Sequence, residues 1–177
     1  MNGTIEKEDL PSPGTRGFAC DAYPAWIVMV RWIILLMAFA LGIYVLSDIR
    51  EAWGVIYVGY ALIALTLILP LSRCSNCFYH GKSCNTGWGK VAGYLFPKGD
   101  ESKYVDHYSY AIFLHFLWLV PLLASIFQLL RRRDVKALVI LVVFLFVLLL
   151  EKIVLRALAC KRCHQREICP ALPFRKK

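Results

Sequence analysis

The chain has 177 residues, of which 59% are hydrophobic and only 19% charged, and its formal net charge at pH 7 is +9. This composition is more apolar than that of soluble globular domains. It excludes an ordinary soluble domain and indicates an integral membrane protein.

Four apolar runs are long enough to cross the hydrocarbon of a bilayer, which takes roughly 20 helical residues for about 30 Å. They cover residues 26–46, 54–71, 108–130 and 135–158. The sequence therefore predicts an all-α integral membrane protein with four transmembrane helices in a bundle, a Cys-rich cytoplasmic loop and a Cys-rich tail. We expect the second helix to end near Pro70, because helices tolerate proline poorly in their interior.

The predicted organisation has three parts. Residues 1–25 form a polar N-terminal segment, residues 26–158 a membrane domain that includes the Cys-rich loop 72–107, and residues 159–177 a basic Cys-rich tail. The polar residues before the first run include four acids and no basic stretch of the kind that opens a secretory signal. We therefore expect the first helix to be retained as a span.

The Lys and Arg residues predict the orientation. Four crossings place the N-terminal segment, the loop 72–107 and the tail on one side, which carries 15 Lys and Arg against five on the other. Because positive charge is retained in the cytoplasm, both termini are predicted to be cytoplasmic, in a cytoplasmic (inner) membrane. The triplet Arg131–Arg133 alone favours the reverse orientation. This bias explains the net charge without nucleic acid, and the expected partners are membrane lipid and a protein, either another chain or a second copy.

All seven cysteines fall on the predicted cytoplasmic side, and none lies within a predicted span. They are Cys20, Cys74, Cys77, Cys84, Cys160, Cys163 and Cys169. Cysteines that only filled apolar space would also occur inside the helices, where free Cys is commonly buried. A reducing cytosol disfavours a permanent disulfide framework. The distribution therefore predicts that the thiols act chemically.

The spacing of these thiols is typical of a metal site. The loop reads C-x2-C-x2-H-x3-C, and the tail repeats a C-x2-C pair followed by His and Cys. Two thiolates two residues apart in a tight turn reach one tetrahedral ion at about 2.3 Å. The favoured prediction is a zinc site that takes one C-x2-C pair from the loop and one from the tail, with the other ligand candidates able to replace any of the four. The candidates are Cys74, Cys77, His80, Cys84, Cys160, Cys163, His164 and Cys169.

Three other interpretations stay open. The loop has the spacing of the bacterial ferredoxin run, with His80 in place of its third cysteine and Asn85 in place of its proline, so an iron–sulfur cluster is the alternative. Residues 160–164 match the C-x-x-C-H motif of covalent haem attachment, which we expect only outside the cytoplasm. The thiols could also be inert surface cysteines that bind nothing.

Two functions follow from these sites. With zinc, the protein is predicted to be a scaffold or partner-binding subunit. With an iron–sulfur or dithiol centre, it is predicted to pass electrons between that centre and a membrane quinone. Zinc is redox-silent, so the identity of the metal separates the two functions. No catalytic residue is predicted, and enzymatic activity stays an open question.

Polar groups at membrane depth provide further predictions, because ionisable residues there are costly and usually functional. Arg31 and Glu151 lie at similar depths in the first and fourth runs, so we expect them to pair. His115, about two turns inside the third run, is a candidate to bind a cofactor by donating to a quinone carbonyl. Residues 88–96 are predicted to form a short interfacial helix ended by Pro97, which anchors the loop or lines a lipid or quinone entrance.

Overall fold

The structure is a computed structural model that describes residues 20–166, with the backbone alone for residues 107–109. Within this range the chain is helical and contains no β-strand. The α-helices are α1 (Ala25–Ile49), α2 (Glu51–Ile63), α3 (Trp88–Leu95), α4 (Tyr104–His107), α5 (Ile112–Arg132) and α6 (Val135–Val154). Short 3-10 turns η3 (Glu101–Lys103) and η4 (Tyr108–Ala111) flank α4.

Two of the helices are extended by wider turns. α2 runs on through the π-helical segments η1 (Ala64–Ile68) and η2 (Pro70–Cys74), and α6 through the π-helical η5 (Leu155–Ala159) and the 3-10 turn η6 (Cys160–Arg162). Four helices are then long and apolar enough to cross a bilayer: Ala25–Ile49, Glu51–Cys74, Ile112–Arg132 and Val135–Arg162. The predicted fold class, an all-α four-helix membrane protein, is confirmed.

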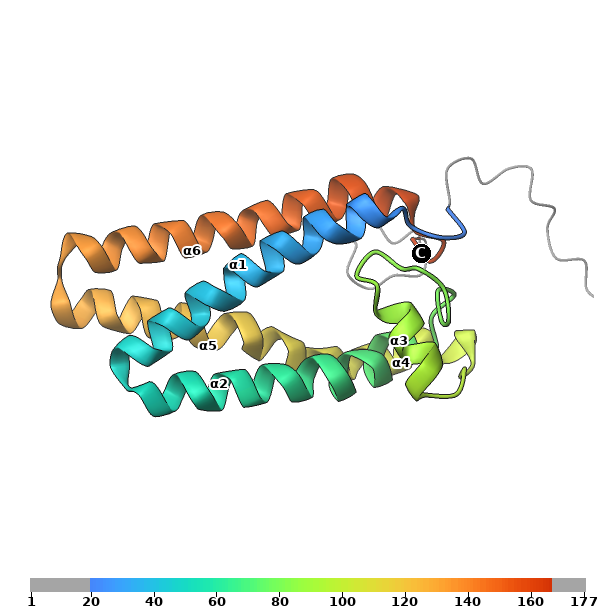
Figure 1. The fold of residues 1–177 in the computed structure, drawn as a ribbon, viewed down its shortest axis with the longest axis horizontal. Coiled ribbons are helices and arrows are strands. Elements are labelled where there is room, and N and C mark those ends of the chain that lie inside the picture. The colour runs from blue at the N-terminus through green and yellow to red at the C-terminus, as the bar shows by residue number, and fades with distance from the viewer. Residues whose placement is uncertain (1–19, 167–177) are drawn as a thin grey trace, which may run out of the picture.

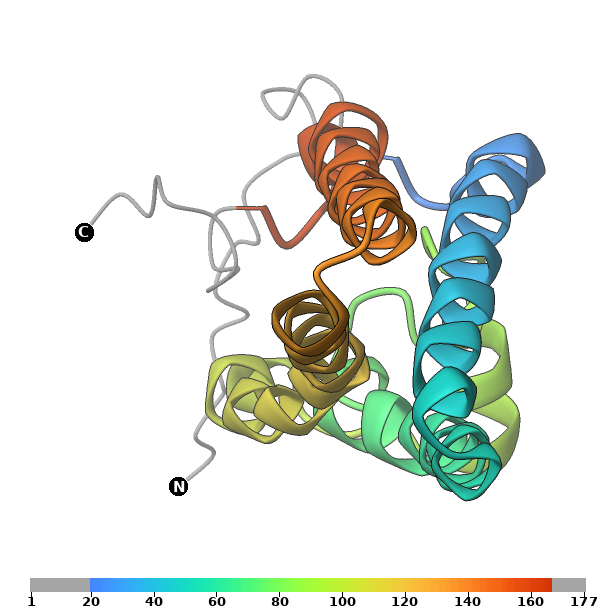
Figure 2. The ribbon, with the colours of Figure 1, turned by 90° about the vertical axis from the view of Figure 1, so that its left-hand side faces the viewer.

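The four long helices form an elongated bundle with two different ends (Figure 1). The connections α1–α2 and α5–α6 lie at one end. The start of α1, residues 72–107 with α3 and α4, and the end of the α6 span gather at the other, which we call the cysteine end. α1 runs obliquely across the bundle, close to α6 at the cysteine end and to α2 at the other (Figure 2).

A proline in α5 creates the need for an interhelical hydrogen bond in the core. Pro121 has no N–H, so the carbonyl of Leu117, four residues earlier, loses its helical donor. The buried Tyr57 of α2 donates its hydroxyl to that carbonyl over 2.9 Å. Gly42 of α1 makes room for this contact, because a Cβ there would lie 2.9 Å from the Tyr57 hydroxyl oxygen. In a bilayer such freed carbonyls must be satisfied by the protein itself.

The prediction that the second helix ends near Pro70 is wrong. The helix widens into π turns on both sides of the proline, so that Ser75 N donates to Pro70 O at 2.9 Å and the helix continues to Cys74. A π turn fits one additional residue, which lets the chain absorb the missing N–H without breaking the helix. The short helix predicted at residues 88–96 is confirmed as α3, which ends at Leu95, two residues before Pro97.

Candidate functional site at the cysteine end

Three distant parts of the sequence meet at the cysteine end. Cys20 N, just before α1, donates to Arg162 O in the tail at 3.0 Å, and Tyr23 N donates to Ser83 O in the loop at 2.8 Å. Cys20, Cys77, Cys84 and Cys163 then lie in one cluster of apolar side chains around Tyr23 and Tyr79. The predicted approach of the loop and tail thiols is therefore present in the structure.

Two tyrosines connect these three segments. Tyr79 of the loop donates its hydroxyl to Cys20 O at 2.8 Å and accepts from His164 N at 3.0 Å. Tyr23 donates its hydroxyl to Ala159 O at 2.7 Å. Their rings lie 5.3 Å apart. Burial, with nearby thiols as a lesser cause, raises the pKa of both tyrosines above the usual range, so both hydroxyls stay protonated as donors.

Cys77 connects the loop directly to the tail. Its Sγ donates to Oε1 of the buried Gln165 over 3.0 Å. Burial raises the pKa of the Cys77 thiol to about 12, and the neighbouring thiols of Cys163 and Cys84 act in the same direction. The Cys77 thiol is therefore protonated at neutral pH unless a cation replaces the proton.

Cys84 already accepts a backbone hydrogen bond of the kind that supports metal-bound thiolates. Gly89 N donates to Cys84 Sγ at 3.1 Å, and the hydroxyl oxygen of Thr86 lies 3.3 Å from the same sulfur. The backbone of Gly89 can come this close only without a side chain, since a Cβ would lie 2.3 Å from Tyr79 O and 2.5 Å from Lys82 O.

Each C-x2-C pair begins at a π turn. Cys74 is the last residue of η2, and Cys160 directly follows η5. The Cys74 thiol lies within electrostatic range of those of Cys77 and Cys84. The six cysteines in the described part of the chain are free thiols, with Cys74 and Cys84 buried and the others half-buried. π turns in α-helices are frequent at functional sites.

The two described histidines of the candidate set make contacts of their own. Nε2 of His80 lies 3.0 Å from Phe96 O, which ties the loop to the end of α3. The ring of His164 stacks on that of Phe78, with centroids 3.9 Å apart. Among the side chains that the structure describes, no three from Cys, His, Asp or Glu lie close enough together to hold a metal ion. Cys169 lies outside the described residues, and the ligand set stays a prediction.

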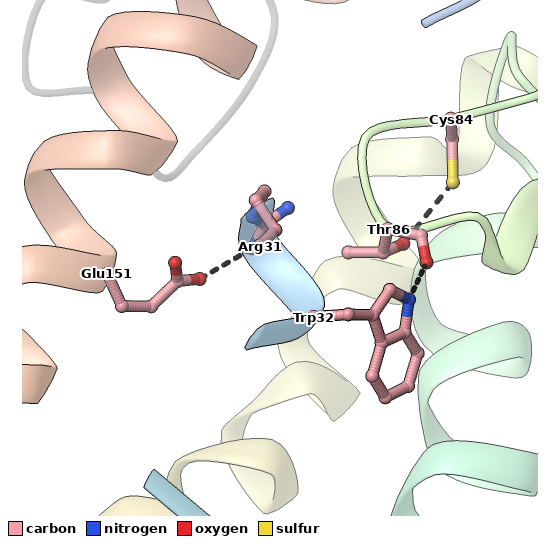
Figure 3. A network of polar contacts seen from close by, with 5 residues as sticks. All are labelled: Arg31, Trp32, Cys84, Thr86 and Glu151. Carbon is pink, nitrogen blue, oxygen red and sulfur yellow. Dashed lines mark hydrogen bonds and ion pairs between the residues drawn. The ribbon is translucent and has the colours of Figure 1, made fainter. Parts of the chain in front are cut away.

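An ion pair lies just below the cysteine end, inside the membrane span. Nη2 of Arg31 is 2.6 Å from Oε1 of Glu151, with side-chain exposures of 6% and 14%, so the predicted pair is confirmed (Figure 3). The next residue, Trp32, donates its indole N–H to Thr86 O at 2.8 Å. α1 thus holds α6 on one side and the loop segment that carries Cys84 on the other.

A cavity of about 620 Å³ adjoins the first C-x2-C pair, and sequence reasoning missed it. Ser75 and Asn76, the two residues between Cys74 and Cys77, contribute to its wall. Phe96 and Pro97 form another part of the wall, so the segment that ends α3 does border an apolar cavity. His115 is exposed on α5, its Nδ1 3.1 Å from Ala111 O, and is not among the lining residues; its cofactor role stays a prediction.

The fold and this end of the bundle define a four-helix integral membrane protein in which buried and half-buried thiols from three segments converge at one end. Comparison with protein-family models, with curated proteins and with solved structures finds no match to this chain.

Proposed function

We propose that the protein is a membrane scaffold or partner-binding subunit whose cysteine end is organised by a bound metal ion, with zinc favoured. The observation that supports this proposal is the convergence of the buried Cys84 and the half-buried Cys77 and Cys163 in one apolar cluster. Thiols gathered in this way at the ends of two spans are suited to one tetrahedral ion, and Cys74 or Cys160 is near in sequence to supply the fourth ligand.

Metal binding replaces thiol protons and is coupled to folding, so the ligands need not be at coordination distance beforehand. The thiol proton of Cys77 forms a hydrogen bond to Gln165 Oε1, and the backbone N–H of Gly89 already donates to the sulfur of Cys84. A zinc ion at this place would clip the loop to the tail and hold the cysteine end in one shape. We propose that this fixed surface, on the cytoplasmic side of an inner membrane, is what a partner protein or a second copy recognises.

The second candidate is a redox protein that passes electrons between an iron–sulfur centre and a membrane quinone. It is favoured by one observation, the apolar cavity against the Cys74–Cys77 turn. The dithiol version of this function is disfavoured, because a Cys77 thiol with a pKa of about 12 is a poor nucleophile at neutral pH.

Elemental analysis and a visible spectrum of anaerobically purified protein test the proposal. We expect about one zinc per chain and no colour, with zinc lost in Cys77→Ser and in Cys163→Ser. Ser83→Ala is a matched control in the same loop that removes no thiol, and it should keep its zinc. Iron with sulfide and broad visible absorption would support the redox function instead. Absence of any metal from the wild-type protein would contradict both metal functions.

A further inference from the structure

The cavity at the cysteine end has the dimensions of a ligand site. Its volume of about 620 Å³ lies within the range of about 300–1,000 Å³ that is usual for small-molecule pockets. Its walls are mostly apolar and partly aromatic, with contributions from Ile68, Leu71, Phe96 and Phe113. Among the described residues that line it, none carries a charge.

One polar side chain in this cavity lacks a partner. Asn76 is only 7% exposed, yet its amide makes no hydrogen bond to any group that the structure describes. The nearby hydroxyls of Ser72 and Ser75 instead donate to Leu69 O and Pro70 O. Buried amides are normally hydrogen-bonded, so an unpaired one that lines a cavity indicates a ligand that completes it.

The neighbouring chain determines which atom of Asn76 is available. Gly99 N donates to Ser75 O at 2.9 Å, and a Cβ on Gly99 would come within 2.0 Å of Asn76 Oδ1. The amide oxygen is thus covered by Gly99. The Nδ2 group remains as a donor, so the ligand atom that it fits is an acceptor such as a carbonyl oxygen.

The cavity lies at the cysteine end of two spans. Its walls come from the last turns of the span Glu51–Cys74 and from the start of the span Ile112–Arg132. When such spans cross a bilayer, their ends lie where hydrocarbon gives way to headgroups. Leu71, Tyr110 and Phe113 are about half exposed at its rim. A molecule dissolved in the bilayer can enter here without crossing water.

We propose that this cavity binds a membrane quinone, with one ring carbonyl accepting a hydrogen bond from Asn76 Nδ2 and the flat ring held by Phe96 and Phe113. A phospholipid fits less well, because no cation among the described lining residues is placed to hold its phosphate. The quinone ring would then lie beside the Cys74–Cys77 turn. Binding requires no metal, so this inference does not depend on the zinc site.

Equilibrium binding of a benzoquinone with a ten-carbon tail to the full chain in lipid nanodiscs tests the proposal. Asn76→Leu removes the donor at nearly constant volume and should weaken binding about tenfold. Ile68→Trp fills the cavity and should abolish binding, which keeps the test valid if Asn76→Leu misfolds. Metal-free protein carrying Cys163→Ser should bind as the wild type does.

Ile112→Ala is the matched control, because Ile112 is exposed at the start of α5 and does not line the cavity, and binding should be unchanged. His115→Leu tests the other candidate donor to a quinone carbonyl, and it should leave binding unchanged if Asn76 is the donor. The proposal is overturned if His115→Leu weakens binding while Asn76→Leu does not, since the quinone would then lie on the exposed face of α5. It is also overturned if both cavity variants bind as the wild type does, or if the cavity retains only phospholipid that Ile68→Trp displaces.

Discussion

Arg31 and Glu151 form a buried pair that is incompletely satisfied. Within residues 20–166, Nε and Nη1 of Arg31 and Oε2 of Glu151 are buried without hydrogen-bond partners. Removing one member of such a pair leaves an uncompensated charge and destabilises by about 3–5 kcal/mol, whereas replacing both members by apolar residues is often neutral. The main effect of the pair is therefore to specify that α1 packs on α6, and its net contribution to the stability of the bundle is small.

A double-mutant cycle at this pair tests that view. Arg31→Met and Glu151→Leu should each lower the free energy of unfolding in detergent by about 3 kcal/mol, and the double variant should be close to wild type. Thermal or denaturant unfolding of the four proteins gives the coupling. Additive losses, with the double variant the least stable, would show that the two residues act separately.

The Cys77 thiol provides a prediction about pH. Its pKa of about 12 means that, once metal is removed by chelation, only ~10⁻⁴ of it is thiolate at pH 8. Alkylation at Cys77, followed by peptide mass spectrometry, should be about 10³-fold slower than in the denatured chain. Because the folded pKa exceeds that of the unfolded thiol, the unfolded chain loses its proton first, and stability should fall as pH rises from about 9 to about 12. Equal labelling of folded and denatured protein at pH 8 would contradict the burial of Cys77.

Among single residues, the sequence predicted those that stand out by their charge or by their spacing along the chain. Arg31 and Glu151 were found because charges at membrane depth stand out, and the thiols because of their spacing. Asn76 was missed because an asparagine in a polar loop is unremarkable in sequence, and its significance comes only from burial beside Gly99. The contact of His80 with Phe96 was also beyond prediction, because it depends on how α3 folds back on the loop.

At the scale of elements, the apolar pattern of the sequence predicted the four spans but not where two of them end. The four spans were predicted because the bilayer requires long apolar helices. Their ends at the cysteine side were not, since Pro70 is accommodated by π turns that no apolar pattern signals. The second span therefore ends at Cys74 and the fourth at Arg162, which brings each C-x2-C pair to a helix end.

The hydrogen bond from Tyr57 to Leu117 should depend on Pro121. Tyr57→Phe leaves the Leu117 carbonyl unpaired and should destabilise the protein by about 1–3 kcal/mol. In a Pro121→Ala background, residue 121 supplies the missing N–H, so the same Tyr57→Phe change should have a smaller effect. Unfolding in detergent measures both effects. An equal loss in the two backgrounds would mean that the proline does not create the need for the tyrosine.

For the whole molecule, the orientation in the membrane is predicted from the distribution of Lys and Arg alone. The excess of Lys and Arg at the cysteine end predicts that this end lies in the cytoplasm. A fluorescent-protein fusion at the C-terminus should fluoresce, and an alkaline phosphatase fusion at Arg133 should be active. The reverse pattern would place the thiols outside the cytoplasm and make covalent haem attachment at Cys160 and Cys163 the better interpretation.

The architecture of the whole molecule explains why the sequence predicted that the loop and tail thiols lie on one side, but not which of them meet. Four crossings bring the loop and tail to the same side, which the sequence predicts. Which thiols then meet depends on the tilt of α1 and on the tyrosines that tie Cys20 to the loop and tail. These contacts bring Cys77, Cys84 and Cys163 into one cluster, which makes them the central ligand candidates of the proposed metal site.

Zinc K-edge X-ray absorption tests most directly whether loop and tail thiols share one ion. The wild-type protein should show a sulfur shell at about 2.3 Å. Cys77→Ser and Cys163→Ser should each lose one sulfur from that shell or lose the zinc altogether, while Ser83→Ala keeps the wild-type spectrum. A shell of oxygen and nitrogen alone, or a sulfur shell unchanged in either cysteine variant, would contradict a metal site shared by the loop and the tail.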